Sequence, residues 1–131
     1  MEMDIGFPGG KRVDVRYQGF TIATDQAVEH GGQGSAPEPY ALFLASLGAC
    51  AGSYVLAFCQ SRGIPTEGLG LVQRTISGPG GKGLARIELE VVLPVGFPEK
   101  YEKAVLRAAN ICAVKKTIQD PPEIALSARR A

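Results

Sequence analysis

The feature that most constrains the fold is one long apolar stretch, "YALFLASLGACAGSYVLAFCQSR", which spans residues 40–62. Pro39 precedes it and suits the first turn of a helix, because the N–H that proline lacks would be unpaired there anyway. Gly63 and Pro65 mark its end. Apolar residues occupy almost every face of such a helix, which is typical of a helix inside a protein. We therefore predict one central buried helix over residues 40–62.

The segments on either side of this helix show the pattern of strands. In "DIGFPGGKRVDVRYQGFTIATDQ" the apolar residues recur at every second position around "PGG" and "QG", which predicts two or three short antiparallel strands. The glycine-rich and proline-rich "HGGQGSAPEP" then predicts a loop. After the helix, residues 69–76 and 84–93 flank a glycine-rich turn and predict a long hairpin.

The last third of the chain predicts two helical segments and a strand. "FPEKYEKAVLRAAN" has a proline and acids in its first turn and apolar residues at helical spacing. "CAVKKTIQ" predicts one or two further turns that end at "DPP", and "EIALSAR" predicts a final strand. Runs of strands with helices between them favour an α+β fold in which antiparallel sheets pack around the long helix. A chain of 131 residues is expected to form one domain over 1–131.

The charge balance argues against two classes of partner. The chain has 14 basic and 13 acidic residues and a net charge of +1, and no basic cluster exceeds "KR" or "KK". We therefore expect no nucleic acid and no membrane surface as partner. The most apolar part, residues 41–51, is too short to cross a bilayer, and no signal peptide precedes it. The expected location is the cytoplasm.

The three cysteines are the candidate reactive groups. Cys50, Cys59 and Cys112 are odd in number, widely spaced and without a CxxC motif, which excludes a disulfide framework and a zinc site. In a reducing compartment such thiols are either buried packing groups or reactive groups. Residues nine apart on a helix point in opposite directions, so Cys50 and Cys59 cannot share a pocket. If a pair acts together it is Cys50 with Cys112, and Cys59 is a packing residue.

Two further observations concern the surroundings of these thiols. Gly48 and Gly52 flank Cys50 and weaken a helix, which predicts that another segment or a substrate approaches closely there. If Cys112 begins a helical turn, the positive end of that helix, together with Lys115 and Lys116, would favour its thiolate. The single histidine, His30, cannot form a metal site alone, and we expect no metal and no cofactor.

At the level of motifs, "APEPYALFLASLGACAGSYVLAFCQSRGI" together with "AVLRAANICAVKKTI" resembles the OsmC/Ohr family, the osmotically inducible and organic hydroperoxide resistance proteins, in its OsmC-like branch. The resemblance covers nearly the whole chain. It implies an intertwined homodimer with two active sites at the subunit interface and a thiol-dependent peroxidase without metal, haem or flavin. By position, Cys50 corresponds to the peroxidatic cysteine and Cys112 to the resolving cysteine. Their disulfide would be reopened by an external dithiol reductant after a hydroperoxide substrate is reduced.

The resemblance also implies a cation beside the reactive thiolate. The family contributes an arginine from its N-terminal strands across the dimer. In this chain the turn reads "GGKR", so Lys11 or Arg12 is the candidate, with Arg16 further along the same predicted strand.

The family's hydroperoxide-resistance branch orients that arginine with a glutamate ten residues before the reactive cysteine. Here that position is Tyr40, and the nearest acid is Glu38, two residues earlier and separated by Pro39. Because an unoriented cation stabilises a thiolate less well, this departure counts against efficient turnover of organic hydroperoxides.

Two other functions fit the same residues. In the first, the chain is a non-catalytic protein that binds a small ligand, and Cys50 only lines the pocket. In the second, the thiol chemistry is kept but acts on persulfides or disulfides.

Overall fold

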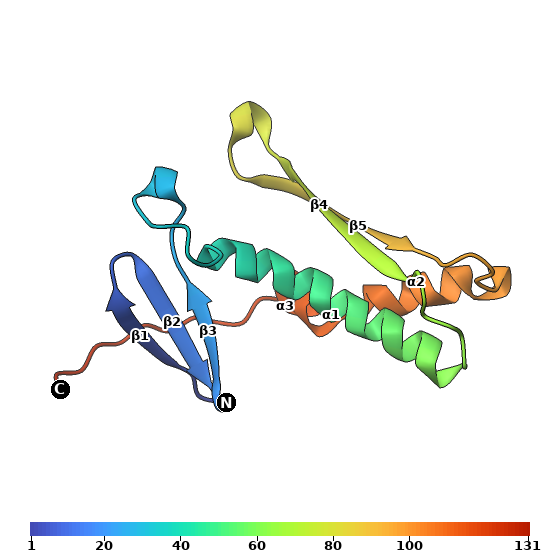
Figure 1. The fold of residues 1–131 in the computed structure, drawn as a ribbon, viewed down its shortest axis with the longest axis horizontal. Helices are drawn as coiled ribbons and strands as arrows, with labels where there is room; N and C mark the ends of the chain where they lie inside the picture. The colour runs from blue at the N-terminus through green and yellow to red at the C-terminus, as the bar shows by residue number, and fades with distance from the viewer. The chain divides into compact units, whose positions relative to one another are not determined.

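The computed structural model describes residues 1–131 and consists of two compact units, Met1–Ala45 and Ser46–Ala131. The single domain over 1–131 stays a prediction, and each unit is described by itself. The helices and strands follow in the order β1 (Asp4–Gly9), β2 (Arg12–Tyr17), β3 (Phe20–Thr24), η1 (Val28–His30), α1 (Pro39–Ser61), β4 (Gly70–Ser77), η2 (Pro79–Gly81), β5 (Leu84–Val92), η3 (Glu99–Tyr101), α2 (Glu102–Asn110) and α3 (Ala113–Gln119) (Figure 1). Helices and antiparallel sheets in this order confirm the α+β class.

The first unit contains a three-stranded antiparallel sheet in the order β1-β2-β3 (Figure 1). Ile5 pairs with Val15, and Val15 pairs with Ile22 on the other side, so the alternating apolar positions share one face. The turn between β1 and β2 contains Gly10 at a φ of 59°, a backbone conformation that favours glycine. The prediction of short antiparallel strands is confirmed for all three.

The loop between β3 and α1 is held by a buried acid. Asp25 is 1% exposed, and its carboxylate accepts hydrogen bonds from the backbone N–H of Gln26 at 2.8 Å and from the N–H and Oγ of Ser35 at 3.0 and 2.6 Å. These bonds, led by the Ser35 hydroxyl, lower the pKa of Asp25 to about 2. A side chain at Gly32 would collide with the backbone of Gln26, so the loop closes tightly on itself.

The central helix α1 begins at the predicted proline, but it is not buried on every side. In the second unit only Leu47, Ala51, Val55, Phe58 and Cys59 of α1 are buried. From Ser46 to Gln60 the exposed residues follow helical spacing on one face and are uncharged: Ser46, Ala49, Ser53, Leu56, Ala57 and Gln60. The prediction of an all-round buried helix is therefore wrong for the single chain, because one sheet and one short helix cover only part of its circumference.

The length of α1 also changes an expectation about membranes. The helix has 23 residues and a mean hydropathy of 1.9 in its most apolar window, so by length and composition alone it could cross a bilayer. The prediction that this stretch is too short to cross a bilayer considered only residues 41–51, whereas the helix is longer. Core helices of water-soluble proteins meet the same criterion, so α1 by itself is weak evidence for a membrane span.

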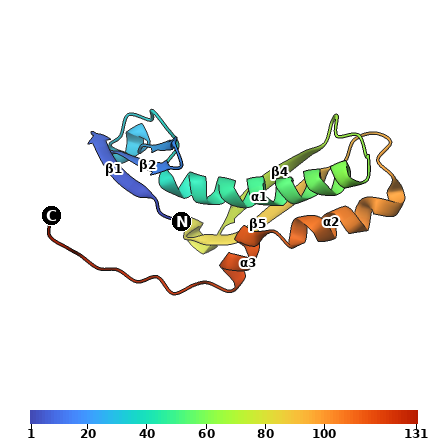
Figure 2. The same cartoon turned by 90° about the horizontal axis from the view of Figure 1, so that it is seen from below.

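The second unit packs the β4–β5 hairpin and α2 along α1, and the three lie side by side in both views (Figures 1 and 2). Leu71 pairs with Val91 and Gln73 with Leu89 across the hairpin. One part of the core consists of the buried residues Val55, Phe58, Cys59, Ile64 and Val105, against which apolar residues of the hairpin and α2 pack. Both strands of the hairpin and the amphipathic helix α2 were predicted within a few residues of these bounds.

The predicted final strand in "EIALSAR" is absent. Residues 121–131 form no helix or strand and run away from α3 as an extended segment (Figure 2). Ile124 and Leu126 are 84% and 95% exposed. An extended segment becomes a stable strand only when it forms hydrogen bonds with another strand, and this segment pairs with no strand of its own chain. The prediction is therefore wrong for the single chain.

Candidate functional site

Two of the three cysteines lie in one packing cluster of the second unit. Cys112 is fully buried with Leu47 and Ala51, and Cys50 packs against this group while remaining partly exposed. Tyr54 of α1 and apolar side chains of the hairpin complete the surroundings, namely Leu71, Ile87 and Leu89, together with Val114 of α3. Two thiols that are far apart in the sequence thus contribute to the same cluster, as expected if they act as a pair.

Cys112 begins the short helix α3. It is the N-cap residue, with φ −61° and ψ 144°, and its Sγ accepts a hydrogen bond from the backbone N–H of Lys115 at 3.4 Å. The expected position at a helix start is therefore correct. Neither lysine side chain forms a hydrogen bond to Cys112: the Lys115 ammonium donates to Asn110 Oδ1, and Lys116 is exposed. The contact to Cys112 comes from the backbone.

Cys59 belongs to a different part of the core. It is fully buried among Val55, Phe58, Ile64 and Val105, in a cluster that contains neither other cysteine. Burial raises the pKa of the Cys59 thiol, and the nearby Arg62 charge opposes this effect only in part. A buried neutral thiol is a packing group, which agrees with the opposite helix faces predicted for Cys50 and Cys59.

The glycines that flank Cys50 differ in their surroundings. A Cβ atom at Gly48 would lie 2.7 Å from Oε1 of Gln73, so the absence of a side chain lets the Gln73 amide lie directly over α1. A Cβ at Gly52 would meet nothing within 4 Å in the single chain. The close approach of another segment that was expected beside Cys50 is therefore found at Gly48, and the approaching segment is β4. Nothing within the chain explains Gly52.

Replacing Gly48 by leucine is expected to lower the free energy of unfolding by about 1–3 kcal/mol, because the added side chain must displace the Gln73 amide from between α1 and β4. Chemical denaturation of the variant checks this value. The double variant Gly48→Leu/Gln73→Ala should recover part of the loss, since the shorter alanine leaves room. A single variant as stable as the wild type would contradict the assigned contact.

An apolar pocket of about 420 Å³ adjoins the thiol cluster in the second unit. Its lining residues come from α1, β5, α2 and α3, and they are Leu47, Ile87, Leu89, Val91, Leu106, Ala109, Asn110, Lys115, Ile118 and Gln119. Leu47, Ile87 and Leu89 also belong to the cluster around Cys112. Neither cysteine lines the pocket, so it is a neighbour of the thiol site.

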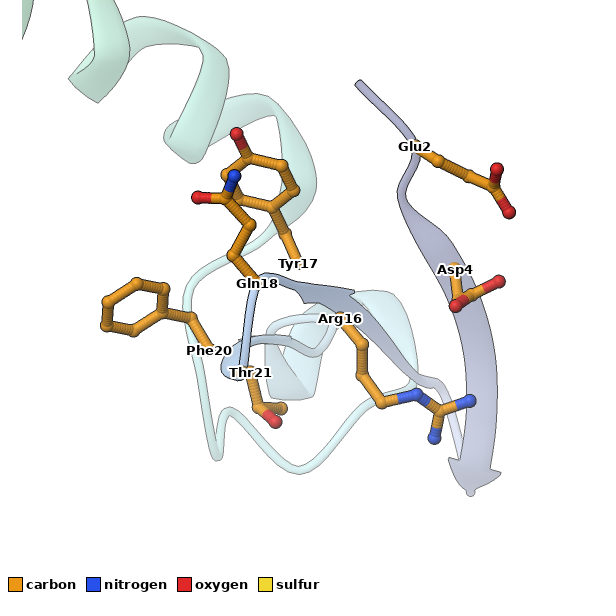
Figure 3. A pocket seen from close by; sticks show the side chains of 8 residues that line it. Glu2, Asp4, Arg16, Tyr17, Gln18, Phe20 and Thr21 are labelled. Carbon is orange, nitrogen blue, oxygen red and sulfur yellow. The ribbon is translucent and has the colours of Figure 1, made fainter.

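In the first unit, the candidate cations fall into two places. Lys11 and Arg12 line a small pocket of about 160 Å³ with the glycines of the β1–β2 turn and Asp25, whereas Arg16 lines a different pocket. Figure 3 shows the Arg16 side chain directed towards β1, the strand that carries Asp4, with Glu2 just before it. Lys11 and Arg12 therefore form one candidate group, and Arg16 is separate from it.

Arg12 already has a partner on its own strand. Its Nη2 atom donates to both carboxylate oxygens of Asp14 at 3.3 and 3.2 Å, while its buried Nε atom has no hydrogen-bond partner. Lys11 forms no side-chain ion pair or hydrogen bond, and its side chain passes beside Gly31 of the loop before α1. The sequence predicted neither arrangement, because nothing in the spacing distinguishes an Arg12–Asp14 pair from two independent charges.

Glu38 pairs with His30. The distance from His30 Nδ1 to Glu38 Oε2 is 2.8 Å, and the glutamate contacts neither Lys11 nor Arg12. The pair joins residues eight apart across a glycine-rich loop, so no helical or strand periodicity could have predicted it. No group of three or more His, Cys, Asp or Glu side chains is placed to hold a metal ion.

Comparisons with known proteins agree on one family. A family model for OsmC-like proteins matches residues 32–127. No curated protein matches the chain significantly. Among solved structures, a protein of Psychrobacter arcticus described as an osmotic stress-induced and detoxification response protein has a TM-score of 0.74 and 19% identity, covering 88% of this chain and 85% of that one. An OsmC-like protein of Mycoplasma pneumoniae has a TM-score of 0.64 and 18% identity, covering 92% and 89%.

A third solved structure carries a more specific description. It is an organic hydroperoxide resistance protein of Legionella pneumophila, with a TM-score of 0.56 and 20% identity over 91% of this chain and 90% of that one. At such identities the likeness to these structures shows the fold alone.

Proposed function

The chain belongs to the OsmC-like protein family, and from this premise we propose that it is a thiol-dependent peroxidase that reduces organic hydroperoxides in the cytoplasm. The observation that carries the proposal is the cluster in which a partly exposed Cys50 packs against a group containing the buried Cys112. An accessible thiol with a second thiol in its cluster is the arrangement that a peroxidatic and a resolving cysteine require.

The proposed reaction uses only these two thiols and an external dithiol. The Cys50 thiolate attacks the outer oxygen of the hydroperoxide, the O–O bond breaks, and the alkoxide takes up a proton and leaves as an alcohol. Cys50 is then a sulfenic acid. The Cys112 sulfur attacks the Cys50 sulfur, an S–S bond forms and water leaves. The external dithiol reduces this disulfide to two thiols and is itself oxidised to a disulfide.

A cation near Cys50 would favour the thiolate that this chemistry needs. We assign this role to the Lys11–Arg12 pair of the β1–β2 turn, contributed by the second subunit of a homodimer. Lys11 has no competing ion pair, whereas Arg12 would have to share its guanidinium with Asp14. This difference favours Lys11 as the group that is free to reach another partner.

The exposed surface of α1 supports the homodimer. The uncharged exposed face of α1, defined above by its six residues from Ser46 to Gln60, is not covered by the hairpin or by α2 of the second unit. The nearly fully exposed Ile124 and Leu126 belong to a segment that pairs with no strand of its own chain. A second copy would cover the helix face and provide a strand edge for the segment.

We therefore expect the protein to have twice its chain mass of 13.8 kDa in solution. Replacing Ala57 by arginine would place a charge on the exposed α1 face and should shift the protein towards the monomer, whereas Lys82→Glu in the β4–β5 turn should not. Light scattering coupled to size exclusion at micromolar concentration measures the mass. A monomeric wild type would refute the dimer.

The activity itself is tested by peroxide consumption. Purified protein is supplied with a dithiol reductant and with either cumene hydroperoxide or hydrogen peroxide, and the remaining peroxide is measured over time. We expect turnover with both and faster turnover with cumene hydroperoxide, because apolar side chains surround Cys50. If neither substrate is turned over, the proposed peroxidase activity is refuted.

The apolar pocket favours a second candidate function. Its volume of about 420 Å³ and its few polar groups are typical of small-molecule sites, and it does not include Cys50. If the protein binds a small apolar ligand in solution and shows no peroxide turnover, the binding function replaces the peroxidase.

A further inference from the structure

The apolar pocket of the second unit contains a single charged group. Its volume of about 420 Å³ lies in the range of small-molecule sites. The helices α1, α2 and α3 and the strand β5 contribute aliphatic side chains, and the polar groups come from Asn110, Lys115 and Gln119. Only the Lys115 ammonium is charged, and no carboxylate lines the pocket. A ligand that fits this lining is therefore apolar over most of its surface.

The charge of Lys115 is not neutralised within the chain. Its ammonium donates to Oδ1 of Asn110, which is a neutral amide, and it takes part in no salt bridge. A carboxylate accepts hydrogen bonds from an ammonium and from amide N–H groups such as that of Gln119, and its bonds to a cation are stronger than bonds between neutral groups. One ammonium balances one negative charge, which favours a monocarboxylate over a phosphate dianion.

The position of Lys115 suits the head group of such a ligand. Lys115 is partly exposed and Asn110 is exposed, so a carboxylate bound to them keeps contact with water. The cost of removing its charge from water, which is large for a fully buried ion pair, is then small. The aliphatic part of the lining is left for an apolar tail.

We propose that this pocket binds a small amphipathic carboxylate. Its aliphatic tail packs against the lining that includes Leu89 and Leu106, and its carboxylate accepts from the ammonium of Lys115. The inference rests on the second candidate function, the binding of a small ligand, and deepens it by naming the ligand class. It does not depend on the peroxidase, because no cysteine lines the pocket.

Lys115 also connects the pocket to Cys112. Its backbone N–H donates to Cys112 Sγ at 3.4 Å, and its side chain lines the pocket together with Ile118 and Gln119 of the same short helix. Cys112 is fully buried, so a reagent reaches it only after a local opening of the structure. An opening that moves α3 takes three lining residues away from the ligand. Binding of the carboxylate therefore opposes this opening and protects Cys112.

Calorimetric titration of the full-length protein with octanoate tests the binding. Octan-1-ol and octylamine have the same tail and are the matched probes for the head group. We expect octanoate to bind about two- to fivefold more tightly than octan-1-ol, as for a partly exposed ion pair, and octylamine to bind most weakly. Lys115→Met keeps an aliphatic side chain and should lower the affinity for octanoate to that for octan-1-ol. The control Lys116→Met changes an exposed neighbour that does not line the pocket and should have no effect.

Alkylation by iodoacetamide, followed at each cysteine peptide by mass spectrometry, tests the link to Cys112. At an octanoate concentration of about ten times its Kd, alkylation of Cys112 should slow about elevenfold, because a ligand that binds only the closed form reduces opening by the factor 1 + [L]/Kd. Cys50 is partly exposed and needs no movement of α3, so its rate should stay the same. In Lys115→Met the protection at the same octanoate concentration should decrease together with the affinity.

The possible results separate the carboxylate site from ligand binding in general. Equal affinities for octanoate and octan-1-ol, or an octanoate affinity that Lys115→Met leaves unchanged, overturn the carboxylate site while the binding function stands. If none of the three probes binds, both are overturned. Octanoate binding by Ala57→Arg but not by the wild type would mean that a second copy fills the pocket, which also overturns the proposal. Octanoate binding that leaves the alkylation of Cys112 unchanged overturns the link through α3.

Discussion

Replacing Cys50 by serine is expected to abolish hydroperoxide reduction. A serine hydroxyl does not ionise near neutral pH and cannot take up the peroxide oxygen, whereas a cysteine thiolate takes it up and becomes a sulfenic acid. The first step of the proposed cycle is therefore lost. The packing should change little, because Cys50 lies at the edge of its cluster and is partly exposed. Steady-state consumption of cumene hydroperoxide with a dithiol reductant measures the effect. We expect the rate to fall to that of the reductant alone.

The matched control is Cys59→Ala. Cys59 is fully buried in the other part of the core and its pKa is raised, so it should not react with peroxide. Its replacement should therefore leave the catalytic rate unchanged, with a modest loss of stability from the removed sulfur. Full activity in Cys50→Ser, or loss of activity only in Cys59→Ala, would show that the reactive thiol has been misassigned.

The central helix, the hairpin and the N-terminal strands could be predicted because local patterns determine them. Pro39 and Gly63 delimit α1 in the sequence as they do in the structure, and the glycine-rich turn between residues 76 and 84 separates β4 from β5. Placing Cys50 and Cys59 in different parts of the core needed only the helical repeat. These features depend on residues that are close in sequence or on one regular element.

Other features could not be predicted, because they depend on contacts between distant segments. The Gln73 amide over Gly48 joins β4 to α1, and the His30–Glu38 pair crosses an irregular loop. The apolar composition of α1 predicted burial, but within the second unit the hairpin and α2 cover only one side of the helix. The strand expected in residues 123–129 failed for the same reason: its apolar alternation is present in the sequence, and its hydrogen-bonding partner is not present in the single chain.

Replacing Cys112 by serine is expected to allow one turnover and then stop the cycle. Cys50 would still be oxidised to a sulfenic acid, but the buried thiol that condenses with it would be missing, so excess peroxide would convert Cys50 to the sulfinic acid. A sulfenic-acid trapping reagent should label Cys50 in Cys112→Ser and only weakly in the wild type. Peroxide consumed in the first seconds should equal the concentration of subunits.

The wild type provides the complementary measurement. Peptide mapping after mild oxidation should find a Cys50–Cys112 disulfide and a reduced Cys59, because bridging requires Cα atoms within about 7 Å and the two halves of the core keep Cys59 away from Cys112. A principal disulfide that contains Cys59 would mean that α1 rotates or unfolds during the reaction. Continuous turnover by Cys112→Ser would instead mean that the external dithiol reduces the sulfenic acid directly, which would remove Cys112 from the mechanism and leave Cys50 as the only essential thiol.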